Sequence, residues 1–276
     1  MNLTSAGSRL ATLRCLRSSS RSAMPIPFEQ SVASTRATLA IVEALRTGQP
    51  QSLAAGEPDE VVEQEPELLM LNSWHLQNSS RYTEAFATLD RIEVLIDAGA
   101  EYQSYASDIT RTFPVNGRFK AAQREIYELV LEAQEAAISK VKPGNHWNDP
   151  HRAAVRVLTK GLLRLGLLRG TLAKALKAES YTRFFMHRTG HWLGMDVHDV
   201  GDYKVDGHWR ELERGMVLTI EPGLYIPRGS KGVAKKWWNI GIRIEDDVLV
   251  TKEGCEVLTD GAPKQPDDIE ALMSSG

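Results

Sequence analysis

Cysteine is nearly absent from this sequence of 276 residues, which contains only Cys15 and Cys255. The two lie far apart and lack the close spacing of thiolate metal ligands. A disulfide framework is therefore not expected, which favours a reducing compartment and a cytoplasmic location. Any metal site must be built from histidine and carboxylate side chains.

Long hydrophobic runs are also lacking. The richest apolar stretch, residues 161–168, is interrupted by Arg164, whereas a membrane-spanning helix needs roughly 20 apolar residues. The net charge of −3 gives no reason to expect nucleic acid or a membrane as a partner. With 42% hydrophobic and 25% charged residues, the composition indicates a globular protein of one large domain or two modest ones.

Acidic residues are missing from residues 1–28, which are rich in serine and carry four arginines: Arg9, Arg14, Arg17 and Arg21. This composition is typical of an organelle transit peptide, so a mitochondrial location is the alternative to the cytoplasm. The competing interpretation is a disordered leader without an address, or a spurious upstream extension of the gene. Residues 29–90 contain an acidic run at 57–67, typical of a solvated linker, and offer no chemistry.

From residue 91 onward the pattern of apolar residues predicts regular elements. Alternation predicts strands over 91–97, 102–113, 215–226 and 241–251. Amphipathic spacing predicts helices over 121–141 and 150–165, the second with Asp149 as its N-cap, and a shorter helix over 172–179. The tail, 261–276, carries proline and aspartate and is expected to be frayed.

Three of the seven histidines lie in one stretch, residues 186–201: His187, His191 and His198. Imidazole binds metals and moves protons near neutral pH, so this stretch is a candidate site. The competing interpretation is a solvated loop with incidental histidines. A zincin helix is excluded, because position 188 is Arg instead of Glu, and because Gly190 and Gly194 disfavour a helix.

Four acidic residues interrupt the apolar strands: Asp97, Asp108, Glu221 and Glu245. A buried carboxylate is costly unless it is paired or binds a cation. If the four converge, two divalent cations would balance their negative charges. Oxygen-rich ligands with one imidazole suit Mn, Co or Zn. Two such ions about 3.5–4 Å apart can hold a bridging hydroxide and polarise a carbonyl, as in two-metal hydrolases.

Each of these acids also has a structural interpretation. Asp108 could pair with Arg111, Glu245 could pair with Arg243, and the other two acids could cap a turn or lie on an edge strand. Four such acids together with three clustered histidines favour the metal site over these separate explanations. The histidines not needed as ligands, together with Arg243, could stabilise an oxyanion or transfer a proton.

The order and spacing of these residues resemble a known family. Asp97-Ala-Gly-Ala-Glu-Tyr and, eleven residues on, Asp108-Ile-Thr-Arg-Thr-Phe-Pro are similar to the first two ligand motifs of the Xaa-Pro aminopeptidases. The histidine stretch, then Thr219-Ile-Glu-Pro-Gly, then Gly241-Ile-Arg-Ile-Glu-Asp resemble the remaining motifs in order. The similarity covers residues 91–264 and is greatest to the bacterial type of these pita-bread metallopeptidases, a group that includes prolidase.

The resemblance implies an α+β pita-bread fold, with a curved antiparallel sheet flanked by helices. It implies a dinuclear-metal-dependent aminopeptidase that hydrolyses the N-terminal Xaa-Pro bond of peptides through a metal-bridging hydroxide, with manganese as the metal. Substrates would be peptides with proline at position two, and a homo-oligomer is expected because the family often forms dimers or tetramers. Two alternatives stay open: a prolidase-type Xaa-Pro dipeptidase, and an inactive truncated relative that acts as a binding module.

The resemblance also implies a role for each ligand. Asp97 would bind one metal, and Asp108 and Glu245 would bridge the two. His191 and Glu221 would complete the second metal site, and Glu221 would also take the proton from the bridging water.

Three further residues would act around the metals. His198 would stabilise the tetrahedral intermediate, and His187 would line the substrate pocket. Arg243 would hold the ligands in place through Glu245 or a neighbouring acid.

The N-terminal part departs from the family's pattern. No segment matches the family's separate N-terminal domain, and Ser80 stands where its leading strand carries a pocket histidine. His75 is out of register and takes no role. We therefore expect a leader (1–28), a truncated or poorly matching region (29–90), the metallopeptidase catalytic domain (91–264) and a tail (265–276). The first half of the pita-bread fold would then be incomplete.

Overall fold

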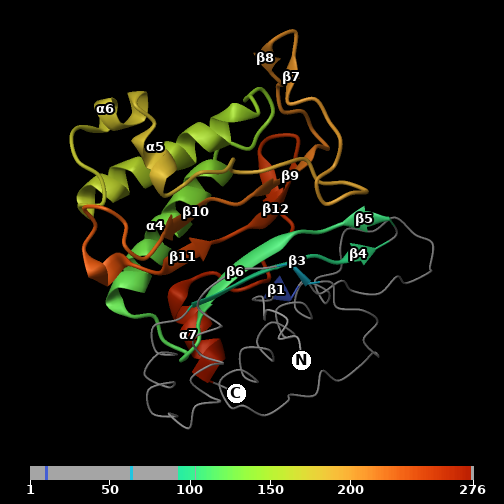
Figure 1. Cartoon of the computed structure of the whole chain (residues 1–276). Coiled ribbons are helices and arrows are strands. Elements are labelled where there is room, and N and C mark those ends of the chain that lie inside the picture. Colours follow the sequence, from blue (N-terminus) through green and yellow to red (C-terminus); the bar gives the residue numbers. More distant parts are fainter. Residues whose placement is uncertain (1–9, 12–62, 65–92, 103, 275–276) are drawn as a thin grey trace, which may run out of the picture.

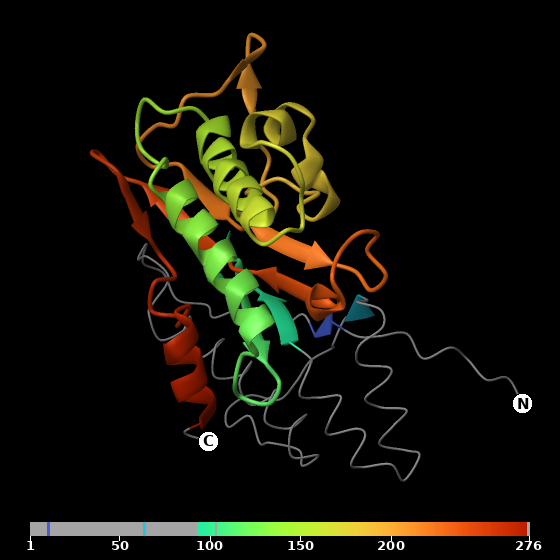
Figure 2. The same cartoon turned by 90° about the vertical axis from the view of Figure 1, so that its left-hand side faces the viewer.

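A computed structural model describes residues 10–11, 63–64, 93–102 and 104–274. Within them, short antiparallel strands form a layer that helices α4 (Ala121–Ile138) and α5 (Asn148–Arg164) cover on one side (Figures 1 and 2). The shorter helices are α6 (Leu172–Lys177), η1 (Ser180–Arg183), η2 (Lys235–Trp237) and α7 (Pro266–Ser274). The mixture of helices with antiparallel strands agrees with the expected α+β class.

Little of the predicted leader and of the region 29–90 is described. Strands β1 (Leu10–Ala11) and β2 (Glu63–Gln64) pair antiparallel. The other predictions for residues 1–90, those on Ser80 and His75 included, lie outside the described residues, as does the completeness of the first half of the fold.

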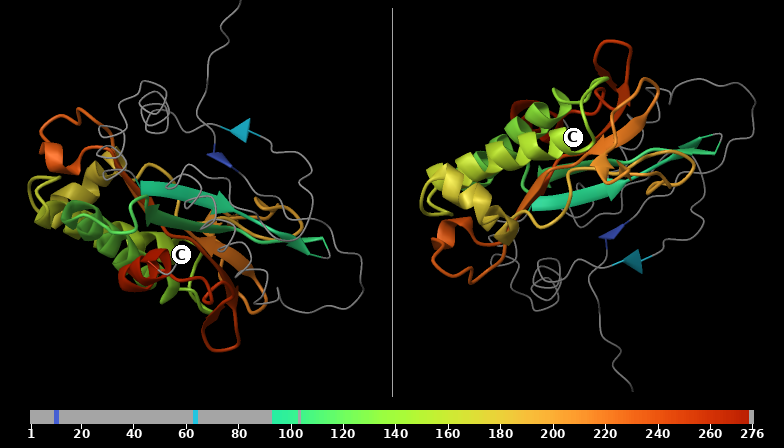
Figure 3. Two further views of the ribbon diagram at one scale, coloured as in Figure 1. Left: turned by 90° about the horizontal axis from the view of Figure 1, so that it is seen from below. Right: turned by 90° about the horizontal axis from the view of Figure 1, so that it is seen from above.

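Three groups of antiparallel strands form the layer (Figure 3). They are β3 (Glu93–Ala98) with β6 (Ile109–Pro114), β10 (Gly223–Ile226) with β11 (Ile240–Arg243), and β9 (Val217–Ile220) with β12 (Asp246–Val250) and β13 (Cys255–Val257). β6 lies beside the junction of β11 and β12. There the Thr112 hydroxyl donates to the Arg243 carbonyl, and the Glu245 amide donates to the Thr110 carbonyl. Strands that are distant in sequence therefore meet at one place.

The prediction of continuous strands over 215–226 and 241–251 is wrong. The first divides into β9 and β10 at Glu221-Pro222, and the second divides into β11 and β12 at Ile244-Glu245. Proline has no N–H to donate to a strand ladder, which accounts for the first break. Each break falls at one of the candidate acids.

The predicted strand over 102–113 is also interrupted. Ser104 has a φ of 65° and turns the chain, so that β4 (Glu101–Tyr102) pairs with β5 (Tyr105–Ala106) before β6 begins. Gly99 lets the chain close at the base of this hairpin, because a Cβ atom there would lie 2.2 Å from the Ser107 carbonyl oxygen. Asp108 consequently stands immediately before β6, opposite the end of β3 that carries Asp97.

Helices α4 and α5 pack side by side and form the core with the strands (Figure 2). The predicted apolar stripe of α4 is confirmed as buried: Ile126, Leu129, Val130, Ala133 and Ala137. Gly161 of α5 permits the close approach of the two helices, because a Cβ atom there would lie 2.2 Å from Leu129 Cδ1.

Two predictions about helix ends are wrong. α5 begins one residue before Asp149, whose Oδ2 accepts the His146 N–H at 2.9 Å instead of capping the helix. The tail is not frayed up to residue 274, because α7 buries Ile269 and because Glu270 Oε1 accepts the Phe119 N–H at 3.0 Å. Partners elsewhere in the chain thus order a segment whose own composition indicated disorder.

Glu93 is a buried acid that the sequence pattern did not single out. Its Oε1 accepts the Gly241 N–H at 2.7 Å, and its Oε2 accepts from Gln123 Nε2 at 2.6 Å. Burial raises the pKa of Glu93 to about 7, against the lowering effect of these hydrogen bonds. The side chain ties β3 to β11 and to α4, on the same strands that carry Asp97 and Arg243.

One hairpin projects from the strand layer, formed by β7 (Lys204–Val205) and β8 (His208–Trp209) (Figure 1). It follows the histidine stretch in the chain. Among the residues that the structure describes, no helix has both the length and the apolar character that crossing a membrane requires.

Candidate active site

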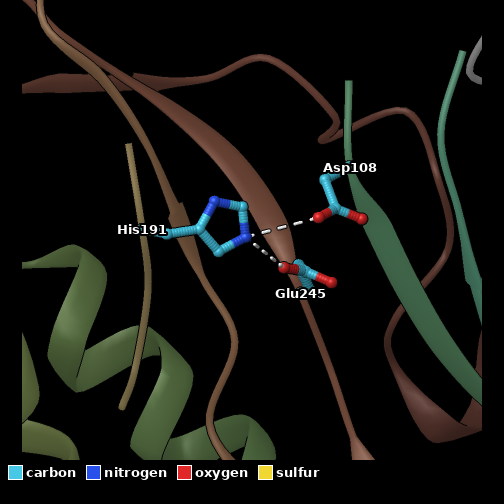
Figure 4. A group of neighbouring side chains, drawn as sticks. All are labelled: Asp108, His191 and Glu245. Atoms are coloured by element: carbon cyan, nitrogen blue, oxygen red, sulfur yellow. Dashed lines mark ion pairs between the residues drawn. The ribbon is translucent and has the colours of Figure 1, made fainter. Parts of the chain in front are cut away.

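Asp108, His191 and Glu245 form a buried cluster in which one potential ligand atom from each residue lies within 4.8 Å of the others. His191 Nε2 is 3.4 Å from Asp108 Oδ2 and 4.0 Å from Glu245 Oε1 (Figure 4). The three side chains come from separate parts of the chain and point toward one another. The structure therefore brings together three of the five predicted metal ligands.

The orientation of His191 leaves one ring nitrogen free for a cation. Its Nδ1 lies 3.0 Å from the Trp192 carbonyl oxygen, which can only accept, so Nδ1 carries the proton of the neutral ring. Nε2 then presents a lone pair toward Asp108 and Glu245. Such a backbone hydrogen bond on the opposite nitrogen is the usual way to orient a metal-binding histidine.

Asp97 extends the cluster on the side of β3. Its carboxyl group is paired with the Arg243 guanidinium. Burial and the charge of Asp108 raise the pKa of Asp97 to about 6, although Arg243 opposes this. The pairing answers one open alternative, because Arg243 forms its ion pair with Asp97 and not with Glu245.

Glu221 completes the predicted set of acids. Its Oε2 lies 3.8 Å from His187 Nδ1, and its side chain is mostly buried. Burial raises the pKa of Glu221 to about 7, while the charges of Arg243 and His191 lower it. Because Asp97 and Asp108 also act on this pKa, Glu221 shares one electrostatic environment with them.

The raised pKa values show that, without a cation, the surrounding protein stabilises the charged carboxylates poorly. Burial and the charges of Asp108, Glu221 and Asp97 raise the pKa of Glu245 well above its usual range. Burial favours the neutral form of His191, but its proximity to Asp108 and the other nearby carboxylates outweighs this and raises the pKa. Carboxylates crowded around an imidazole fit divalent cations, which would supply the missing positive charge.

Thr110 orients the cluster and was missed by the sequence interpretation. Its hydroxyl donates to Glu245 Oε2 at 2.5 Å and accepts from Arg243 Nε at 3.2 Å. It lies on β6 two residues after Asp108, so the strand period places both side chains on one face. The spacing of two residues from Asp108 could therefore have indicated Thr110 as a residue of the site.

Two further acids behind the cluster were also missed. Both oxygens of Asp247 accept the Asp108 N–H, at 3.1 and 3.3 Å, and so hold the backbone of that ligand. Asp246 pairs with Arg111 at 2.7 Å and with Lys264 at 2.6 Å. Arg111 thus pairs with Asp246 instead of Asp108. The run of three acids, residues 245–247, in an apolar strand could have indicated them. The local pattern does not identify the partners of these acids.

The other two histidines of the stretch, His187 and His198, precede and follow His191 in the sequence. His187 Nδ1 donates to the Arg188 carbonyl oxygen at 2.6 Å, which leaves Nε2 to accept from the Tyr225 hydroxyl at 2.9 Å. His198 is exposed, and its ring lies edge-on to that of His191 with centroids 4.2 Å apart. Tyr225 is another residue that the sequence did not single out.

The glycines of the histidine stretch allow it to lie close to its neighbours. The His191 carbonyl accepts the Thr219 N–H at 3.0 Å, and the Thr189 carbonyl accepts the Glu221 N–H at 2.8 Å. A Cβ atom on Gly190 would lie 2.0 Å from the Thr219 carbonyl oxygen. The stretch is therefore held along β9 by its backbone, which excludes the interpretation as a loosely solvated loop at residues 189–193.

Comparison with known proteins places these motifs in a family. Residues 75–252 match metallopeptidase family M24. The chain is 51% identical over 181 residues to the Xaa-Pro aminopeptidase of Haemophilus influenzae, covering 66% of this chain and 42% of that protein. It is 51% identical over 180 residues to the Xaa-Pro aminopeptidase of Escherichia coli, covering 65% and 40%. The chain thus spans about two fifths of the length of these curated relatives.

Solved structures show the same similarity. The Pseudomonas aeruginosa aminopeptidase PepP matches with a TM-score of 0.69 and 43% identity, over 90% of this chain and 57% of that one. Zinc-substituted Escherichia coli aminopeptidase P in complex with product matches with a TM-score of 0.64 and 50% identity, over 66% and 41%. The expected pita-bread fold and the resemblance to Xaa-Pro aminopeptidases are confirmed. Because the family match covers more than half of the chain, this chain belongs to metallopeptidase family M24.

Proposed function

We propose that this protein is a metal-dependent aminopeptidase that removes the first residue from peptides with proline at position two. The observation that carries the proposal is the buried cluster of Asp108, His191 and Glu245, with Asp97 and Glu221 beside it. The names of the similar Xaa-Pro aminopeptidases support this substrate class. Since the chain spans only part of those relatives, its own activity has to be measured.

The residues present fit two divalent cations. We assign Asp97 to one metal, His191 and Glu221 to the other, and Asp108 and Glu245 to both. Four carboxylates and one imidazole form an oxygen-rich set, which suits manganese among the candidate ions. When bound, the two cations would activate a water molecule and polarise the scissile carbonyl.

The chain's own residues supply proton transfer and positioning. Glu221, mostly buried beside the cluster, takes the proton of the attacking water. His198, exposed beside His191, donates to the developing oxyanion. His187, fixed by Tyr225, lines the substrate pocket, and Arg243 holds Asp97 in place.

Peptide hydrolysis by the purified full chain, loaded with Mn²⁺, tests the proposal. Mass spectrometry should detect release of alanine from an Ala-Pro-peptide but not from the matched Ala-Ala-peptide. Asp108→Asn should abolish release, whereas Asp260→Asn, a change at an exposed acid outside the cluster, should leave it unchanged. Failure of the metal-loaded wild type to release alanine contradicts the proposal.

The same assay separates the two alternatives. A prolidase would cleave the Ala-Pro dipeptide and leave the longer peptide intact. A binding module would hydrolyse neither and would hold far fewer than two metal ions per chain in elemental analysis. Gel filtration of the same sample tests the expected homo-oligomer. The cysteine count supports our proposal of a cytoplasmic location, which fractionation of cells would test.

A further inference from the structure

A partly buried histidine on α5, His151, lies behind the site and has no role in the proposed mechanism. His151 lines a small cavity of about 10 Å³ between α5, the histidine stretch and β9, together with Arg188, Thr189 and Thr219. A cavity of this size is at the lower limit for a single water molecule.

His151 makes one polar contact, with the histidine stretch. Its Nδ1 lies 2.8 Å from the Thr189 hydroxyl, and Thr189 is 2% exposed. Its ring also packs against Phe185, with centroids 5.8 Å apart. The imidazole thus contacts the histidine stretch at Thr189 and the residue just before the stretch, Phe185.

Both contacts lead directly to residues of the proposed mechanism. The carbonyl oxygen of Thr189 accepts the Glu221 N–H at 2.8 Å, and Thr189 is two residues from His191. The Phe185 ring meets the His187 ring edge-on at 4.9 Å. His151 is therefore one residue removed from both Glu221 and His187, although it touches neither the proposed metals nor the substrate.

The surroundings of His151 keep its imidazole neutral. Burial, together with the positive charge of the nearby Arg188, lowers its pKa to about 4. Arg188 is held at this place by Asn148 Oδ1, at 2.5 Å, and by the face of the Trp209 ring at 5.1 Å. A neutral ring can stay buried and hydrogen-bonded to Thr189 over the physiological pH range.

We propose that His151 is a positioning residue, whose contacts with Thr189 and Phe185 fix the backbone that holds Glu221 and the ring of His187. The proposal rests on the proposed peptidase function. It goes beyond that function because it assigns a role to a helix residue outside the five motifs that indicated the family.

Two replacements separate the hydrogen bond from the volume of the side chain. His151→Leu fills the space but removes the polar atom, and His151→Asn keeps a polar atom where Nδ1 stands. Thr159→Val is the control on the same helix, because the buried Thr159 hydroxyl bonds only within α5, to the Val155 carbonyl at 2.6 Å. The readouts are kcat and KM on the Ala-Pro-peptide, Co²⁺ affinity by titration of the metal-free protein, and the melting temperature.

We expect His151→Leu to lose activity and metal affinity, and His151→Asn to retain both. For His151→Leu we expect kcat and Co²⁺ affinity each to fall about 10-fold, the lower end for residues that support metal ligands, with KM within about twofold. His151→Asn and Thr159→Val should stay within about threefold of the wild type. Thr189→Val should cost about as much as His151→Leu, and the double variant no more than either.

The proposal is overturned if His151→Leu behaves like Thr159→Val at a matched melting temperature, or if His151→Asn restores nothing. A wild type that binds Co²⁺ but hydrolyses no peptide contradicts the proposed function instead. The Co²⁺ titration of the variants then still decides on His151.

Discussion

His191 and His198 stand with ring centroids 4.2 Å apart, but only His191 is buried among carboxylates. We expect His191→Ala to weaken Mn²⁺ binding at least 10-fold, because a ligand is lost. We expect His198→Ala to keep the metal and to lower kcat by about 10²–10³, the usual cost of removing one oxyanion donor. Elemental analysis and steady-state kinetics on the same preparations measure both. Equal loss of metal in the two variants contradicts this division of roles.

Arg111 is the second residue whose replacement has a clear expected outcome. Its side chain pairs with Asp246 at 2.7 Å, and the two are 4% and 0% exposed. Arg111→Met would leave a buried carboxylate with less compensation and should lower the free energy of unfolding by about 3–5 kcal/mol.

Arg124→Met is the matched control for Arg111→Met. Arg124 also forms ion pairs, with Glu128 and Asp267, but these groups are largely exposed, so its loss should cost less than about 1 kcal/mol. Denaturant titration compares the two variants. A smaller cost for Arg111→Met than for Arg124→Met would show that Lys264 alone neutralises Asp246.

At the scale of elements, the crossing of α4 and α5 depends on Gly161. Its missing Cβ would lie 2.2 Å from Leu129 Cδ1, so Gly161→Ala should overpack the crossing and cost about 1–3 kcal/mol, despite the higher helix propensity of alanine. In a Leu129→Ala background the same change should instead stabilise by up to about 1 kcal/mol, because the space is then free. Melting curves of the four proteins test this, and a destabilising effect in both backgrounds would contradict the packing argument.

The local pattern identified the acids of this site but not the breaks at which they stand. Asp97, Asp108, Glu221 and Glu245 were visible because a carboxylate is unusual in an apolar strand. The division of each long strand at Glu221 and at Glu245 depends on which strands pair, and pairing is a long-range property.

Long-range partners also explain the other features that the sequence did not show. Asp246 pairs with Arg111, which lies 135 residues away in the sequence. The tail that was expected to be frayed forms α7, because Ile269 packs in the core. By contrast, the stripe of α4 follows from its own period, and that prediction was correct.

For the molecule as a whole, the crowded carboxylates make the stability of the fold depend on pH and on metal binding. Without metal, the folded protein holds protons on acids whose pKa values are raised, to about 6 for Asp97 and about 7 for Glu221. The unfolded chain releases these protons near its ordinary pKa of about 4. The contribution of these acids to stability is therefore largest below pH 4 and is lost as the pH rises to 7.

Bound cations reverse this dependence, because they require the deprotonated carboxylates. The difference in melting temperature between Mn²⁺-loaded and chelator-treated protein should therefore widen from pH 5.5 to pH 7.5. Scanning calorimetry at the two pH values measures it, with His191→Ala as the control in which the difference should be small at both. A difference that stays constant or narrows with rising pH would mean that the cations bind elsewhere than among these carboxylates.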